Sequence, residues 1–327
     1  MAQKGVNALL RMVLKRLGLG VITLFVVSLI IFSAVTMLPG DFTKAMLGQS
    51  ATPDTVAAWQ KEVGLDRPPV ERYIHWISGV VRGDFGVSFA SKGGQQRTVV
   101  SLIAPRLENT FFLASFAAII AVPLALVLGL LAALYRYSLY DRIVNLLALT
   151  AVSSPEFFLA YILMLFLAVK FPIFYSLGTV SATTPLDERL LRAALPALTL
   201  VLVIVAQMMR MTRAAVINLL SSPYIEMARL KGVSPRDIVL HHALPNAWAP
   251  IATVIALNLA YLIVGVVVVE VVFVYPGIGQ LMVDAVSKRD IPVVQGCAII
   301  FAATYILLNL LADIVSIATN PRLLHPR

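Results

Sequence analysis

The stretch NTFFLASFAAIIAVPLALVLGLLAALY, residues 109–135, decides the class of fold, because it contains no charged side chain. A transmembrane helix needs about 20 apolar residues, which at 1.5 Å of rise per residue span roughly 30 Å of hydrocarbon. Apolar runs of about 10–14 residues are typical of helices buried in soluble domains, and this run is much longer. The stretch therefore predicts a helix that crosses a membrane.

The composition of the whole chain agrees with this interpretation. Of its 327 residues, 59% are hydrophobic and 13% are charged, and the mean hydropathy is +0.88. A soluble domain carries about twice that share of charged residues. The single cysteine, Cys297, lies in an apolar run. It excludes a disulfide framework and a thiolate metal site and indicates a packing residue, and we expect no metal site in this chain.

Five further runs are long enough to cross the membrane, which makes six helices in all. Together with 109–135, they are residues 17–38, 143–170, 193–217, 247–270 and 291–314. The run 143–170 contains Glu156, and the run 193–217 contains Arg210 and Arg213, whose long side chains can reach the interface. The predicted fold is an all-α integral membrane protein with six transmembrane helices.

The distribution of charge indicates which way these helices run. We expect residues 1–16, the turn after 109–135, the inner end of 193–217, the loop 218–246, the inner end of 291–314 and the tail 315–327 to be cytosolic. That side then holds thirteen cations and four carboxylates and carries the whole net charge of +9. The cations are Lys4, Arg11, Lys15, Arg16, Arg136, Arg142, Arg210, Arg213, Arg229, Lys231, Arg236, Arg322 and Arg327, and the carboxylates are Asp141, Glu226, Asp237 and Asp313. Both short outer loops are neutral, as the positive-inside rule expects, so the basicity indicates topology and not nucleic-acid binding.

The outer segment, residues 39–108, contains two short helix patterns. In the first, Thr52 is a candidate N-cap, Pro53 stands at the first helical position and Gly64 follows the end. The second pattern, PPVERYIHWISGVVRG, is amphipathic and stops at Gly83. These helices either receive a partner or shield the ends of the membrane helices, and the residues do not decide between the two.

A polar stretch, SPYIEMARLKGVSPRDIVLHHALPN at residues 222–246, interrupts the apolar second half of the chain. Each of its cations Arg229, Lys231 and Arg236 would cost about 2.5–3.5 kcal/mol at the centre of a membrane helix, so the stretch lies in water. By the count of crossings, that water is cytosolic.

The pattern of this stretch predicts helix, turn, helix. Ser222 caps a first helix that starts at Pro223, with Glu226 in its opening turn, and Gly232 ends it. The segment 234–237 reads as a capping box, and Pro245 is expected to break the second helix before the fifth span. Ala228 and Gly232, four residues apart, would leave a notch where another backbone can approach. An ordinary connecting loop remains the alternative.

These residues carry a resemblance. Glu226, Ala228 and Gly232, followed by Leu244 and Pro245, resemble the EAA loop of binding-protein-dependent ABC importer permeases, although Met227 replaces the second Ala and His242 an apolar residue. The resemblance implies a coupling helix that sits in a groove of an ATP-hydrolysing subunit. The implied coupling residues are Tyr224, Glu226, Met227, Ala228, Arg229, Lys231, Gly232, Leu244 and Pro245.

Other motifs are similar to the first-subunit permeases of the dipeptide, oligopeptide and nickel group. They are LPGDF (38–42), GLDRPPVERYIHWI (64–77), GDFGVSF (83–89), RLENTFFLA (106–114), EVVFVYPGIGQLMVDAVSKRDIPVVQG (270–296) and DIVSIATNPRLL (313–324), the last with Asn320 where Asp is common. The resemblance implies a multi-pass subunit of the bacterial inner membrane. Its implied partners are a second homologous permease, two ATP-binding subunits and a periplasmic solute-binding protein. The implied solute is peptide-like, while nickel complexes, opines and oligosaccharides stay open.

The chain contains no G-x-x-x-x-G-K-[ST] phosphate loop and no HExxH, GxSxG or paired-cysteine pattern. We therefore expect no cofactor on this chain, with ATP and Mg²⁺ used by partner subunits, and no catalytic residue.

Candidate pathway and gate residues are Glu156, Glu270, Pro276 and Gly277. Glu156 either lines the pathway and favours amine-bearing solutes, or is protonated and bonded to backbone that Pro155 frees. Glu270 either anchors the Pro276-Gly277 turn or contacts a gate. The rival function is a secondary transporter or channel subunit with Glu156 as proton relay, and an intramembrane enzyme is disfavoured because no catalytic set is evident.

Overall fold

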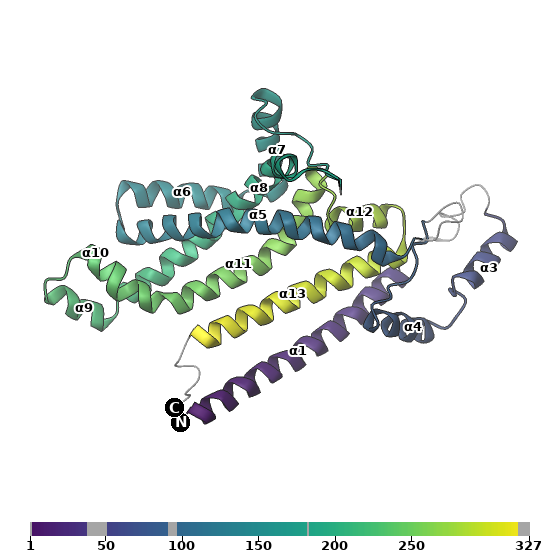
Figure 1. Ribbon diagram of the computed structural model, residues 1–327, viewed down its shortest axis with the longest axis horizontal. Helices are drawn as coiled ribbons and strands as arrows, with labels where there is room; N and C mark the ends of the chain where they lie inside the picture. The colour runs from purple at the N-terminus through teal and green to yellow at the C-terminus, as the bar shows by residue number, and fades with distance from the viewer. Residues whose placement is uncertain (1, 38–50, 91–96, 182, 320–327) are drawn as a thin grey trace. The chain divides into compact units, whose positions relative to one another are not determined.

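The long uncharged runs form long helices in the computed structural model, which describes residues 2–37, 51–90, 97–181 and 183–319 (Figure 1). Among these residues no strand forms, and the one extended pairing is an isolated bridge between Val87 and Thr98. The LPGDF motif and Asn320 lie outside the described residues.

The helices appear in the following order along the chain. They are α1 (Ala2–Thr36), α3 (Pro53–Glu62), α4 (Pro69–Val81), α5 (Val99–Leu134), α6 (Leu139–Ser153), α7 (Glu156–Met164), the π-helix η2 (Leu165–Lys170), α8 (Leu186–Leu220), α9 (Pro223–Leu230), α10 (Pro235–Asp237), the π-helix η3 (Ile238–Ala243), α11 (Leu244–Val272), α12 (Ile278–Ser287) and α13 (Ile291–Thr319).

Five of the described helices are long and apolar enough to cross a membrane. They are Arg11–Thr36, Val99–Leu134, Leu186–Leu220, His241–Val272 and Ile291–Ser316. Several extend beyond the runs expected from the sequence; α5, for example, begins at Val99 and not at 109. The thickness of the bilayer limits the apolar run but does not limit the helix, which can continue into water.

The run 143–170, expected as one helix, is broken. It forms α6 and the α7–η2 pair, which qualify as a span only together and are bent by 105° (Figure 1). Ser154 has extended backbone (φ −93°, ψ 136°), and Pro155 follows it as the N-cap of α7. A proline disfavours helical backbone in the residue before it and removes a helix hydrogen bond, so the sequence Ser154-Pro155 breaks the helix. Counting the bent pair as one span gives the six predicted crossings.

The chain divides into two compact units. The first comprises Met1–Gly20, Phe111–Tyr275 and Tyr305–Arg327. Within it, α8 packs against α6, α7 and α11 and is the most deeply buried of the long helices. One of its apolar clusters joins α5, α8 and α11 through Ala133, Val216, Ala247 and Ile251. Small residues at such contacts let the helix backbones approach closely.

The second unit comprises Val21–Thr110 and Pro276–Thr304. Its core gathers Val99, Ile103, Ile278, Ala285, Val293 and Cys297, and the burial of Cys297 confirms its expected packing role. The two helices expected in the outer segment are present as α3 and α4, and Thr52 caps α3 as the sequence predicts. The Oγ of Ser28 on α1 and the hydroxyl of Tyr73 on α4 lie 2.8 Å apart in a hydrogen bond.

Candidate functional site

The polar loop, residues 218–246, connects α8 to α11, and Figure 1 shows α9 and α10 at the end where these two helices meet. The first short helix, α9, begins at Pro223 with Ser222 as its N-cap residue. The carbonyl oxygen of Ser222 accepts hydrogen bonds from the backbone N–H groups of Ile225 and Glu226. The side chain does not cap the helix as expected, because its hydroxyl donates backwards to the carbonyl of Leu219.

The end of α9 is fixed by Gly232, as the sequence predicts. Gly232 has φ +77°, a left-handed conformation that costs other residues free energy. Its N–H donates to the carbonyl of Arg229 at 2.9 Å, and the N–H of Val233 donates to the carbonyl of Ala228 at 3.2 Å. This pair of bonds is a Schellman motif, which satisfies carbonyl groups at the helix end.

The second helical segment begins at Ser234, whose Oγ accepts from the N–H of Asp237 at 3.1 Å and donates to its carboxylate at 2.7 Å. The expected break at Pro245 does not occur, because the chain passes from η3 into α11 without a non-helical residue. The N–H of Leu244 donates to the carbonyl of Val239, a bond typical of π-helix. The π-helix takes residues out of the α-helical ladder, so a proline without an N–H is tolerated just after it.

A small apolar core holds the two halves of the loop together. It consists of Ile225, Ala228, Ile238 and Ala243, with Leu220 and Val233 packed against it. Ala228 is therefore buried inside the loop, and the expected notch between Ala228 and Gly232 on the surface is wrong. The small side chain allows α9 to pack against η3, and it is not itself a surface for a partner.

The opposite face of α9 carries an exposed apolar stripe of Tyr224, Met227 and Leu230, at a spacing of three residues. Leu230 is the most exposed of the three, with 79% of its surface exposed. It was not predicted as a site residue, because a leucine at this spacing in a helix is usually buried in a core. Residues three apart lie on one side of a helix. The charged residues Glu226, Arg229 and Lys231 are exposed as well. Pro245 is also exposed, and Leu244 is half-buried.

An ion pair that the sequence did not reveal fixes α6 to α8 within the first unit. Arg213, expected as a cation that reaches the interface, donates from Nε to Asp141 Oδ1 at 2.7 Å and from Nη2 to Oδ2 at 2.8 Å. Asn145 Nδ2 and the N–H of Tyr137 also donate to this carboxylate, at 2.6 and 2.9 Å. A bidentate guanidinium–carboxylate pair is among the stronger side-chain contacts.

Glu156 is the first residue of α7, directly after the break, and it is half-buried. Its carboxyl oxygens lie beside Gly265 of α11. Within the described part of the chain this carboxyl group has no hydrogen-bond partner, so the expected bond to backbone freed by Pro155 is absent.

The outer end of α11 carries Glu270, which is fully buried. Its carbonyl oxygen accepts from the N–H of Tyr275 at 2.8 Å, which closes the turn after the helix. The N–H of Gly178, in the loop before α8, donates to the carbonyl of Phe273 at 2.8 Å. This loop therefore lies across the end of α11.

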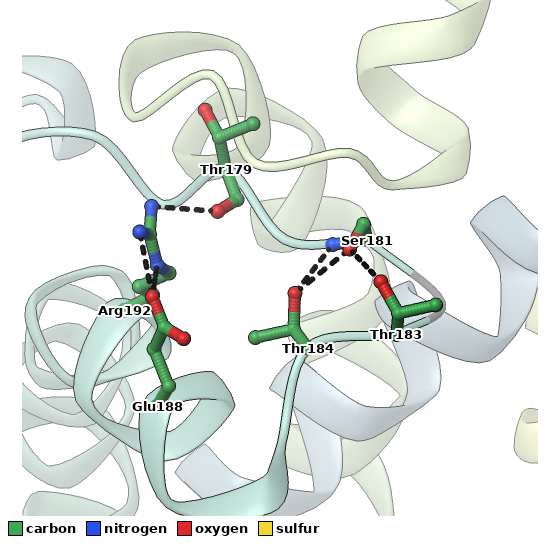
Figure 2. Close-up of polar contacts among 6 residues, drawn as sticks. All are labelled: Thr179, Ser181, Thr183, Thr184, Glu188 and Arg192. Atoms are coloured by element: carbon green, nitrogen blue, oxygen red, sulfur yellow. Dashed lines mark hydrogen bonds and ion pairs between the residues drawn. The ribbon is translucent and has the colours of Figure 1, made fainter.

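Figure 2 shows how the loop before α8, which contains Gly178, also contacts α8 itself. Arg192 of α8 donates from Nε and Nη2 to one carboxylate oxygen of Glu188, and from Nη1 to the carbonyl of Thr179 at 3.0 Å. The hydroxyls of Ser181, Thr183 and Thr184 form a separate set of hydrogen bonds. The loop is thus fastened to α8 as well as to α11.

The Pro276-Gly277 turn belongs to the second unit and is held by two residues that sequence reasoning did not assign to the site. Asn109 Nδ2 donates to the carbonyl of Pro276 at 2.9 Å, and Thr110 Oγ1 accepts from the N–H of Ile278 at 2.9 Å. Gly277 is the N-cap of α12. The only signal in the sequence was that Asn109 and Thr110 are polar residues at the start of an apolar run.

Among the described residues, no three His, Cys, Asp or Glu side chains gather where they could hold a metal ion.

Comparison with known proteins gives matches over nearly the whole chain. Residues 125–325 match the family described as binding-protein-dependent transport system inner membrane component, and residues 9–114 match the N-terminal family of the same membrane components. The glutathione transport system permease protein GsiC of Escherichia coli (strain K12) is 37% identical over 314 residues, which cover 96% of this chain and 98% of the relative. The proteins of the same name from Shigella dysenteriae serotype 1 and Shigella boydii serotype 4 match to the same extent.

Proposed function

This chain belongs to the family of inner-membrane components of binding-protein-dependent transport systems, and from that membership we propose a role for each of its sites. The chain is a multi-pass permease subunit of an ABC importer of the dipeptide and oligopeptide group, located in the bacterial inner membrane. Such a subunit works with ATP-binding and solute-binding partners.

The polar loop is the proposed docking site for an ATP-hydrolysing subunit. The observation that carries this proposal is the exposed apolar stripe Tyr224, Met227 and Leu230 on a helix fixed at its C-terminal end by the Schellman motif. An exposed apolar patch rimmed by charged side chains is typical of a protein–protein contact. Glu226, Arg229 and Lys231 would form its charged rim.

The proposed assembly contains this chain, a second homologous permease, two ATP-binding subunits and a periplasmic solute-binding protein. ATP and Mg²⁺ would be used by the ATP-binding subunits alone, and this chain would bind no cofactor and catalyse no covalent step. Closure of the ATP-binding pair would move the polar loop, and the helices attached to it would carry that movement to the pathway.

The proposed solute is peptide-like. The relatives are named as glutathione transport permeases, and glutathione is therefore the first solute to test. Glu270, Pro276 and Gly277 are proposed as parts of the outer gate, since Glu270 is buried at the outer end of α11 and the turn of Pro276 and Gly277 follows it.

A secondary transporter or channel subunit with Glu156 as proton relay is set aside, because the family matches cover both halves of the chain. Dissipating the proton gradient in vesicles should leave ATP-driven uptake unchanged.

The docking proposal is tested by Leu230→Glu. Because Leu230 is largely exposed, the substitution has little effect on the folding of this chain but places a carboxylate in the proposed contact. We expect the affinity for the ATP-binding subunits to fall at least tenfold, as for an interface hot spot of about 1.4 kcal/mol or more. Co-purification of these subunits and the solute transported per ATP hydrolysed measure the effect, and Glu226→Lys should lower the same ratio.

Leu186→Glu is the matched control, since Leu186 is an exposed leucine at the opposite, predicted outer, end of α8. It should leave the retention of ATP-binding subunits unchanged. If Leu230→Glu also retains them and transports normally, the loop is not the docking site.

A further inference from the structure

A cavity of about 380 Å³ lies beside the break between α6 and α7, within the first unit. Its walls come from the break itself, from Val203 and Gln207 of α8 and from the 261–268 segment of α11. Four lining side chains are polar: Ser154, Glu156, Gln207 and Tyr261. No Lys, Arg or His lines it, so the cavity contains one carboxyl group and no protein cation.

The carboxyl group of Glu156 occupies space that a side chain at position 265 would take. A Cβ atom added to Gly265 would lie 3.2 Å from Oε2 and 3.4 Å from Oε1 of Glu156. The glycine therefore leaves room for the carboxyl group against the backbone of α11. Together with the missing hydrogen-bond partner, this leaves the Glu156 oxygens available to a molecule in the cavity.

The cavity opens beside exposed side chains of α11. Tyr261, Val264 and Val268 line the cavity and are exposed, and Leu257 and Val271 continue the same face of the helix. An ionised carboxylate that faces lipid is costly, whereas one that faces a protein-lined pathway is tolerated. In an importer with two permeases, a face that holds both a carboxyl group and apolar side chains fits the contact with the second permease, where the pathway runs.

We propose that Glu156, with Gln207 and Tyr261, forms a subsite for the ammonium group of an amine-bearing solute, such as the free α-amino group of a peptide. This inference rests on the proposed peptide-like solute. A carboxylate in a cavity without a protein cation lacks its counter-charge, and the solute's ammonium group would supply it through a charge-assisted hydrogen bond. The amide of Gln207 and the hydroxyl of Tyr261 add neutral donors and acceptors for the peptide groups of the same solute.

The position of Glu156 at the start of a helix favours a negative charge, although no described Lys, Arg or His lines the cavity. It is the first residue of α7, where the helix dipole favours negative charge. The ammonium group of a bound solute would favour the ionised form of the carboxyl group further. A proton bound permanently to Glu156 is the competing explanation, and it makes the opposite prediction for a neutral variant.

The test uses the complete importer with its binding protein in proteoliposomes and compares glutathione with N-acetylated glutathione, which lacks the ammonium group. For Glu156→Gln we expect ATP-dependent uptake of glutathione to fall about tenfold or more relative to the wild type, the effect of one lost charge-assisted hydrogen bond. Uptake of the acetylated form should change less than twofold, and Glu156→Asp should keep most of the glutathione uptake. Glu62→Gln, an exposed carboxylate on α3, is the matched control and should change neither.

Equal changes for the two solutes, or no change for either, would overturn the subsite. If the wild-type complex shows no ATP-dependent uptake of either solute, the proposed function fails instead, which keeps the two failures apart. A second measurement on the wild-type complex avoids variants. Modification of Glu156 by a carbodiimide should be slowed by glutathione and not by its acetylated form, and equal rates with both would contradict the proposal.

Discussion

The ion pair between Asp141 and Arg213 gives the most quantitative prediction, because both its geometry and its burial are defined. The guanidinium group contacts both carboxylate oxygens, at 2.7 and 2.8 Å, and only 5% of the Asp141 side chain and 23% of the Arg213 side chain are exposed. Removing one partner of a buried pair costs about 3–5 kcal/mol, because the other charge is left without compensation. Since Arg213 keeps some contact with water, we expect Asp141→Asn to lower the free energy of unfolding by about 3 kcal/mol.

Arg213→Gln should cost at least as much, because it leaves the more deeply buried carboxylate alone. The double variant removes both charges and therefore leaves neither unpaired. Its loss of stability should be smaller than the sum of the two single losses by about 1–3 kcal/mol, the coupling expected for residues in direct contact. Denaturation of the three variants and the wild type in detergent micelles measures all four free energies.

The exposed pair between Arg16 and Asp313 is the control for this cycle. Its atoms are 2.9 Å apart, but 53% and 37% of the two side chains are exposed. Its coupling should stay below about 1 kcal/mol. If the Asp141 and Arg213 variants are additive to within about 0.5 kcal/mol, the reasoning from burial and bidentate geometry is refuted.

Two smaller predictions follow from single backbone positions. Gly232→Val should destabilise the polar loop by about 1–2 kcal/mol and lower the transport obtained per ATP, because φ is +77° there while no atom lies within 4 Å of the new Cβ. Gly232→Asn, which tolerates this conformation better, should be milder, and equal effects of the two would contradict an origin in backbone strain. Thr110→Val should lower the free energy of unfolding by about 1–3 kcal/mol by leaving the N–H of Ile278 without its acceptor, as a thermal shift would show, whereas the exposed Thr183→Val should change it little.

The sequence predicted the membrane helices because a run such as 109–135 is long enough to cross the hydrocarbon layer and contains no charged residue. Few other structures can bury such a run. It also predicted local features that depend on a few neighbouring residues: the start of α3 after Thr52, the left-handed Gly232 and the contact between Ser234 and Asp237. These features are set by backbone sterics and short-range hydrogen bonds, which a short stretch of sequence contains in full.

What could not be predicted depends on contacts between distant segments. Ser154-Pro155 could have kinked one helix, but the chain bends there by 105°. Ala228 is small because η3 packs against it, and no pattern within 222–232 indicates that. Arg213 could have reached the interface alone, and only the fold brings Asp141 to it from 72 positions earlier.

The missing break at Pro245 has a mechanical consequence. From Pro235 to Val272 every residue is helical, over a helical path of roughly 55 Å. The π-helix η3 and Pro250 are the places where this helical segment can bend, but its backbone is not interrupted, so a movement of the polar loop near Ile238 can be passed along α11 toward Phe273. There the carbonyl of Phe273 accepts a hydrogen bond from the N–H of Gly178. A movement of α11 at its inner end would therefore be passed to the loop that lies across its outer end.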